Sequence, residues 1–171
     1  MMRYIFVFAL CFFSCLAYGQ HDVPATDHFK LVGDIKSERV ITVADIKKYP
    51  QADLGDISIK NHRGEEKSVA KHVQGVLMRS LLDSAGISVD KPKELSEYYF
   101  VFTASDGYKN VYSWNEIFNS SVGDKLFIIT EKDGKGLADM EGRINVVSLA
   151  DMNTGRRYLK GLATIEVRRA K

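Results

Sequence analysis

The sequence predicts a single α+β domain of mixed sheets made of short strands, with two to three short helices. Many short runs are rich in β-branched and aromatic residues, as strands are. Two capping boxes each open only a short helical segment. Strands and helices do not alternate regularly, which argues against a doubly wound sheet. Since no internal repeat or linker divides the chain, we expect one domain over residues 20–171, preceded by a signal peptide at 1–19.

The first nineteen residues have the composition of an export signal. Arg3 supplies a basic start, Tyr4 to Phe13 is apolar, and Ala17-Tyr18-Gly19 places small residues at a cleavage site before Gln20. The apolar run is shorter than the roughly 20 residues that a membrane-spanning helix needs. We therefore expect a periplasmic or secreted protein whose mature chain does not insert into the membrane.

A lipoprotein is the alternative, with Cys15 carrying the lipid. Phe12 and Phe13 argue against it, because lipid-attachment signals prefer Leu and a small residue at these positions. Cys11 and Cys15 are the only cysteines, so the mature chain cannot form a disulfide. Removing residues 1–19 leaves 152 residues, enough for one hydrophobic core. With 24 basic and 22 acidic side chains, the chain has no charge excess that would favour nucleic acid.

The N-terminal half begins with a strand at Phe29 to Ile35. Thr42-Val43-Ala44-Asp45 is a capping box, and the helix it opens must end before Pro50. Asp56 to Lys60 alternates apolar and polar residues and, after turn residues 61–64, Glu65 to Val73 returns. This pair predicts a hairpin.

The next element is a helix from Val76 to Ala85. It places Leu77, Leu81 and Leu82 on one face, and Gly86 follows where a left-handed residue commonly ends a helix.

The C-terminal half predicts a second hairpin and three further strands. Tyr98 to Thr103 and Tyr108 to Tyr112 flank the turn Ser105-Asp106-Gly107. Ser113-Trp114-Asn115-Glu116 is the second capping box, opening a helix through Phe118. The remaining strands are expected at Leu126 to Thr130, Arg143 to Ser148 and Leu162 to Arg168. Asp133-Gly134 predicts a turn between the first two of them.

Several motifs in this order resemble the molybdopterin-binding domain of the sulfite oxidase family. The resemblance covers most of the mature chain and rests on the segments Leu31 to Ile35, Ile41 to Ile46, Gly75 to Gly86, Ser105-Asp106-Gly107-Tyr108, Ser113 to Glu116, Asp133 to Leu137, Arg143 to Val147 and Tyr158 to Val167. It implies the α+β fold of that domain and a site for a pterin cofactor.

The chain departs from the family at the metal ligand. The resemblance places the metal-ligating cysteine just after the strand at Ile57 to Lys60, where this chain reads Asn61-His62-Arg63. Neither an amide nor an ammonium group replaces a thiolate as a soft, strongly donating ligand. We therefore expect no molybdenum and no catalytic residues. The chain looks like small exported pterin-binding relatives, which implies a pterin ligand, a molybdopterin-like one included, and a membrane sensor protein as partner.

Candidate binding residues follow from what a flat, polar heterocycle needs, namely a face for stacking and polar groups around its edge. Trp114 is a candidate stacking face or, alternatively, a core anchor. Asp106 can accept from the guanidine-like edge of a pterin or serve as an ordinary turn residue. Ser105 and Tyr108 of the same motif join the candidates.

The other candidates are polar and basic. Asn61, His62 and Arg63 occupy the position of the metal-site loop, or form a solvated hairpin tip. The resemblance also implies roles for Arg143, Arg156 and Lys160, which otherwise are surface charges. Arg157 adjoins Arg156, and in an extended chain the two point to opposite sides, so only one of them is expected to face a ligand.

Other chemistries have weaker signals. The four histidines lack paired metal-ligand spacing, although His21 and His28 leave a mobile N-terminal metal site open. No nucleophile elbow or P-loop is present. A pterin-binding protein is the leading hypothesis; an oxidoreductase with an atypical non-cysteine molybdenum site and a pure interaction module are the alternatives.

Overall fold

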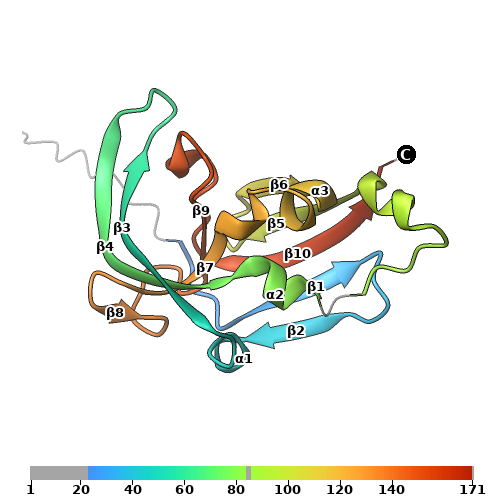
Figure 1. Cartoon of the computed structure of the whole chain (residues 1–171). Helices are drawn as coiled ribbons and strands as arrows, with labels where there is room; N and C mark the ends of the chain where they lie inside the picture. The colour runs from blue at the N-terminus through green and yellow to red at the C-terminus, as the bar shows by residue number, and fades with distance from the viewer. Residues whose placement is uncertain (1–22, 84–85, 171) are drawn as a thin grey trace, which may run out of the picture.

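Two five-stranded sheets form the molecule in the computed structural model, which describes residues 23–83 and 86–170 (Figure 1). The first sheet has the order β2-β1-β10-β5-β6, and the second has β3-β4-β7-β8, with β9 also pairing with β7. The parallel pair is β1 with β10, and the other pairs are antiparallel. The strands are β1 (His28–Gly33), β2 (Arg39–Thr42), β3 (Gln51–Lys60), β4 (Glu66–Leu77), β5 (Tyr98–Ala104), β6 (Lys109–Ser113), β7 (Leu126–Lys132), β8 (Lys135–Gly136), β9 (Asn145–Ser148) and β10 (Leu162–Arg169).

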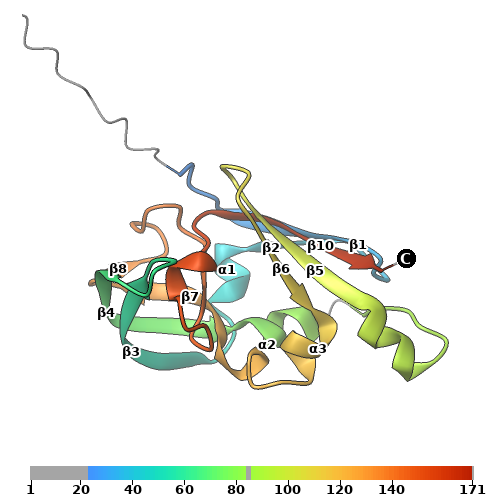
Figure 2. The ribbon, with the colours of Figure 1, turned by 90° about the horizontal axis from the view of Figure 1, so that it is seen from above.

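Short helices connect the strands, as the α+β prediction requires. They are α1 (Val43–Ile46), α2 (Met78–Leu82) and α3 (Trp114–Phe118), with the 3-10 turns η2 (Pro92–Glu97), η3 (Gly123–Lys125) and η4 (Thr154–Arg156). Figure 2 shows the first sheet along the upper edge of the view, with the three α-helices below it on the side of the second sheet. In the part of the chain that the structure describes, no helix is long and apolar enough to cross a membrane.

The core fills the space between the sheets and is built by period-two alternation. In β1, for example, Phe29 and Leu31 are fully buried, while His28 and Lys30 are exposed. Tyr112 of β6 packs its ring 5.0 Å from that of Phe102 in β5. The expected strands at the N-terminus, in the second hairpin and at the C-terminus are confirmed, with ends shifted by a few residues.

Both capping boxes are confirmed. The Asp45 amide donates to Thr42 Oγ1 at 3.2 Å, and the Thr42 amide donates to Asp45 Oδ2 at 3.1 Å. In α3 the Glu116 amide donates to Ser113 Oγ at 3.1 Å, and Glu116 Oε2 accepts from the Ser113 amide at 2.8 Å. These local hydrogen bonds satisfy donors that the helix itself leaves free.

The helix expected from Val76 to Ala85 is wrong at its start. Val76 and Leu77 are the last residues of β4 and pair with Ile128 and Phe127 of β7, so the helix begins only at Met78. Sheet pairing overrides the helical spacing of the leucines here. Residues 84–85 lie outside the described part, and Gly86 has the expected positive φ of 62°. The expected signal peptide, Cys15 and the start at Gln20 also lie outside the described residues.

The first hairpin is longer than expected, because β3 begins at Gln51 and β4 continues to Leu77. A bulge divides it, with Gly55 at φ 65° and His72 at φ 49°. Asp56 Oδ1 accepts from the His72 amide at 3.0 Å and so satisfies a donor that the bulge takes out of the ladder. We call residues 56–71, beyond this bulge, the arm; Figure 1 shows it rising from the body of the molecule.

Two further differences concern the ends of strands. The sequence pattern did not predict β2, which pairs with β1, or the short β8. The strand expected from Arg143 begins at Asn145, because Arg143 has a positive φ of 57° and ends a turn.

Candidate functional site

A pocket lies where three separate segments meet. They are the turn at the end of the arm, the β5–β6 turn, and residues 149–161 between β9 and β10, which we call the strap and which contain η4. The pocket has a volume of about 550 Å³, within the usual range for small-molecule sites. Its lining residues are Ile59, Lys60, Asn61, His62, Lys67, Tyr108, Gly155 and Arg156.

The arm is fastened to the strap by Thr154. Its hydroxyl donates to the Ser58 carbonyl at 2.8 Å and accepts from the Lys60 amide at 2.9 Å. This side chain therefore takes the place of a neighbouring strand along part of the free edge of β3. Gly155 lies so close that a Cβ there would stand 2.6 Å from the Lys60 carbonyl oxygen. The close approach requires glycine and fixes the floor of the pocket.

The turn of the arm is shaped by Asn61. Its Oδ1 accepts from the Arg63 amide at 2.9 Å and from the Glu65 amide at 3.1 Å, an arrangement typical of Asn in turns. Its Nδ2 donates to Glu65 at 2.8 Å. Asn61 and His62 line the pocket as candidates, whereas Arg63 belongs to the same turn but does not line it.

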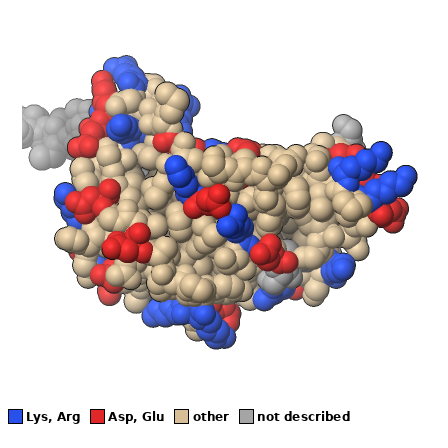
Figure 3. All heavy atoms as spheres, viewed as in Figure 1, with Lys and Arg blue, Asp and Glu red and all other residues tan. Residues whose placement is uncertain are grey.

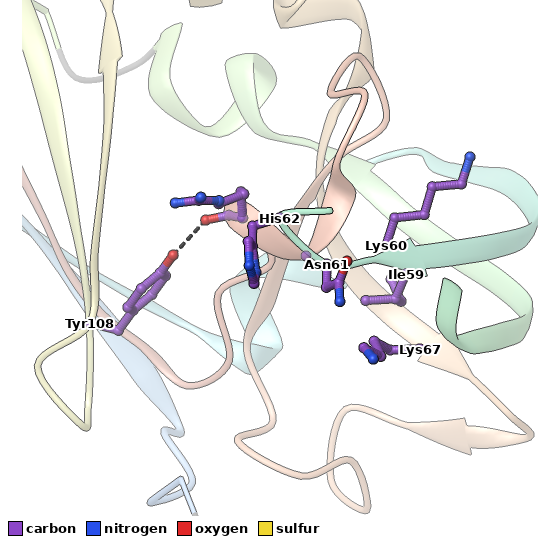
Figure 4. Close-up of a pocket in the computed structure, with 8 residues that line it drawn as sticks. Ile59, Lys60, Asn61, His62, Lys67 and Tyr108 are labelled. Carbon is purple, nitrogen blue, oxygen red and sulfur yellow. Dashed lines mark hydrogen bonds between the residues drawn. The ribbon is translucent and has the colours of Figure 1, made fainter. Parts of the chain in front are cut away.

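The β5–β6 turn contributes Tyr108. Asp106 Oδ1 accepts from the Tyr108 amide at 2.9 Å, so the structure places Asp106 as a turn residue. The Tyr108 hydroxyl donates to the carbonyl oxygen of Arg156 at 2.5 Å. Figure 4 shows Tyr108 on one side of His62 and the other labelled lining residues on the opposite side, while Lys60 points away from Tyr108. Because Tyr108 remains 45% exposed, its ring is available to a ligand.

The pocket is rich in hydrogen-bond donors. Lys60, His62, Lys67 and Arg156 line it, with Lys60 pointing away from Tyr108, and no carboxylate lines it among the described residues. Lys67 pairs with Glu65 at 3.2 Å, outside the lining. Figure 3 shows the arm as a lobe with side chains of both signs, set off from the rest of the surface by a hollow. Such a lining suits a ligand edge made of carbonyl and ring-nitrogen acceptors.

Arg157 does not line the pocket, although the chain here is the 3-10 turn η4 and not the extended segment assumed in the prediction. Its guanidinium binds Asp151 through Nε at 2.7 Å and Nη2 at 2.5 Å, and Glu116 through Nη1 at 3.1 Å. The bonds to Asp151 raise the pKa of Arg157 above its ordinary value. The guanidinium also lies 4.4 Å from the ring centre of Tyr112, and burial raises the pKa of that tyrosine.

Four other candidates lie outside the pocket. Ser105 donates to the Pro24 carbonyl at 2.6 Å and so fastens the N-terminal segment. Arg143 pairs with Asp27, and Lys160 pairs with Glu141 at 2.5 Å. Their charges are thus used in ion pairs near the N-terminal segment and the strap end.

Trp114 is the fourth, and the structure places it as a packing residue. Its ring centre lies 5.3 Å from that of Phe118, and together with Leu82, Ile87 and Leu95 it lines a separate apolar depression. Trp114 lies away from Tyr108 because the whole of β6 separates the β5–β6 turn, which holds Tyr108, from α3, which begins at Trp114.

The sequence reasoning missed four lining residues: Ile59, Lys60, Lys67 and Gly155. The predicted hairpin carries a signal for Lys67, because pairing of its arms returns this residue beside the end of β3. For Gly155 no local signal exists, since its role depends on contact with Lys60, far away in the sequence.

No protein-family model matches the chain, and no curated protein matches it. The structure is similar to the sulfane dehydrogenase SoxCD from Paracoccus pantotrophus, with a TM-score of 0.61 and 12% sequence identity. The match covers 85% of this chain and 40% of that one, so this chain spans less than half of its neighbour. The likeness shows a distant relationship in fold with a sulfite oxidase family protein, which the motifs predicted.

The lining does not fit a molybdenum ion bound as the resemblance describes. Where the thiolate is expected, the arm offers the Asn61 amide, already bonded to backbone amides, and the His62 imidazole. Among the described residues, no group of three or more His, Cys, Asp or Glu side chains is placed to hold a metal.

Proposed function

We propose that this chain is an exported, non-catalytic binding protein that holds a pterin in the pocket between arm, β5–β6 turn and strap. The observation that carries the proposal is that two rings, those of Tyr108 and His62, line one pocket of about 550 Å³ together with polar side chains. The guanidinium donors of Arg156 suit the oxygen and nitrogen acceptors of the heterocycle. A membrane sensor that reads the loaded state is part of the proposal.

The two alternatives find less support. A molybdenum oxidoreductase needs a metal ligand, and the arm offers only the Asn61 amide and the His62 imidazole where the thiolate is expected. A pure interaction module with a filled pocket fits poorly with an open pocket of about 550 Å³. A flat, polar small molecule therefore accounts best for the combination of rings and donors.

The test is a calorimetric titration of the purified chain with a tetrahydropterin under anaerobic conditions. We expect saturable binding and, at 100 times the dissociation constant, stabilisation of the fold by about 2.7 kcal/mol. Tyr108→Ala should weaken binding about tenfold, because it removes a stacking face of the size for which losses of 1–3 kcal/mol are usual.

Trp114→Phe is the matched control, since it changes an aromatic ring outside the pocket and should leave the affinity unchanged. A titration with neither heat nor a thermal shift would contradict the proposal. Equal losses in both variants would move the site toward α3.

A further inference from the structure

One side chain, Arg157, connects the strap to the first sheet and to α3. Within the strap it forms a two-point contact with Asp151, which also accepts from Ser148 Oγ of β9 at 3.1 Å. Across the fold it reaches Glu116, whose other oxygen serves the capping box of α3. Below it lies the ring of the fully buried Tyr112.

The backbone around Arg157 is held at the same place. Asn110 Nδ2 donates to the Arg157 carbonyl at 3.0 Å, and Tyr108 Oη donates to the Arg156 carbonyl at 2.5 Å. Residues of β6 and of the β5–β6 turn thus bind two successive carbonyl groups of the strap, those of Arg156 and Arg157. The Arg157 side chain adds bonds to Asp151 within the strap and to Glu116 of α3. Gly155 and Arg156, the strap residues that line the pocket, directly precede this anchor.

We propose that Arg157 is the positioning residue of the pocket: without touching the ligand, it holds Gly155 and Arg156 in place by bridging Asp151 of the strap to Glu116 of α3. The identity of the ligand in this proposal rests on the pterin-binding function proposed above. The positioning itself is a property of the protein alone, and it can be measured without ligand.

Arginine is needed here because its side chain contacts three groups at once, two carboxylates and one aromatic ring. Its planar fork binds the Asp151 carboxylate at two points, its remaining nitrogen reaches Glu116, and its flat face stacks on Tyr112. A lysine carries the same charge at a single point, so it cannot satisfy both carboxylates and the ring. Arg157→Lys is therefore a test that keeps charge and removes geometry.

The first readout is hydrogen exchange of the protein without ligand. The Lys60 amide is protected by Thr154 of the strap, and the Arg156 amide donates to the Asn153 carbonyl at 3.0 Å. In Arg157→Lys we expect at least tenfold faster exchange at these amides, with little change in β1 and β10. The second readout is affinity for the tetrahydropterin, which should fall about tenfold, in line with the loss of a charge-assisted bidentate contact.

Arg169→Lys is the matched control. Arg169 also binds two carboxylates, Glu94 and Glu97, and lies 5.7 Å from the ring centre of Tyr98, but it stands at the end of β10 away from the pocket. This variant should alter neither strap exchange nor affinity. Glu116→Gln, which keeps a capping oxygen and removes the charge, is the second test if Arg157→Lys fails to fold.

The outcomes separate the two proposals. Faster exchange confined to the strap and the arm turn supports positioning even if no pterin binds, in which case only the proposed function fails. Unchanged exchange in Arg157→Lys, or acceleration spread evenly over both sheets, would overturn the positioning role. If pterin binds, an unchanged affinity in this variant would overturn it as well.

Discussion

At the scale of single residues, the pocket depends on a close approach between Gly155 and the backbone of Lys60. A methyl group at position 155 would stand 2.6 Å from the Lys60 carbonyl oxygen, and this backbone atom cannot rotate away as a side chain would. We expect Gly155→Ala to lower the free energy of unfolding by about 1 to 3 kcal/mol, the usual cost of inserting a methyl group into a packed site. Urea unfolding measures this loss.

Gly136→Ala provides the comparison, because a Cβ there meets open space and the residue has no positive φ. It should leave stability within about 0.5 kcal/mol of the parent chain. A destabilisation of the same size in both variants would mean that the contact with Lys60 carries no special cost.

Single residues also show the limits of sequence reasoning. Of the neighbours Arg156 and Arg157, only Arg156 lines the pocket, but the extended chain on which that expectation rested is absent, because Arg156 ends the 3-10 turn η4 and Arg157 follows it with ψ 14°. The placement of Trp114 does not follow from the sequence, because the sequence distance between the β5–β6 turn and α3 is small while β6 carries the chain away from the pocket. Proximity in sequence predicts proximity in space only within one turn or helix.

At the scale of elements, the predictions that depend on local hydrogen bonds are correct, and those that depend on pairing with distant segments are not. Both capping boxes were predicted correctly, because every bond in them lies within three residues. The start of α2 was not, because Val76 and Leu77 satisfy their backbone by pairing with β7, about fifty residues away. The strap could be predicted only as a loop, since its bonds to the arm and to α3 are all long-range.

The arm is the element whose removal tests the location of the site. Ser58 and Val69 are directly paired, and the buried pair Ile57 and Ala70 lies on the body side of them. Replacing residues 59–68 with Asn-Gly would close the strands with a two-residue turn that matches their twist. We expect a variant that unfolds cooperatively but does not bind the tetrahydropterin, because it lacks five of the lining residues.

The experiment needs one control for the strap, since the variant also removes the Lys60 amide that binds Thr154. Thr154→Val in the full-length arm removes the same hydrogen bond, together with the one to the Ser58 carbonyl, and keeps all lining side chains. Weakened binding in Thr154→Val and complete loss in the shortened arm would assign the ligand contacts to the arm. Full binding by the shortened arm would place the pterin elsewhere.

At the scale of the whole molecule, the α+β class was predictable because it depends on the number and order of elements, while the joining of two sheets into one core was not. The strap belongs to that joining: Leu159 exchanges backbone bonds with Val146 of β9, at 2.7 and 2.9 Å, just before the chain enters β10 in the other sheet. Tyr158 lies at this junction and accepts from Lys132 Nζ of β7 at 3.2 Å.

Because Tyr158 is partly buried at this junction, we expect the free energy of unfolding of the whole fold to depend on pH in the alkaline range. Burial raises its pKa from 10.0 to about 12 in the folded protein. Between these two values the unfolded chain loses the phenolic proton while the folded chain keeps it, so the free energy of unfolding falls as the pH rises. A difference of this size corresponds to about 2 to 3 kcal/mol. Urea unfolding of Tyr158→Phe and of the parent chain at pH 9 and at pH 12 tests this. Between these two pH values, the free energy of unfolding of Tyr158→Phe should fall by about 2 to 3 kcal/mol less than that of the parent chain. Parallel curves for the two proteins would show that the hydroxyl group keeps its contact with water in the folded state.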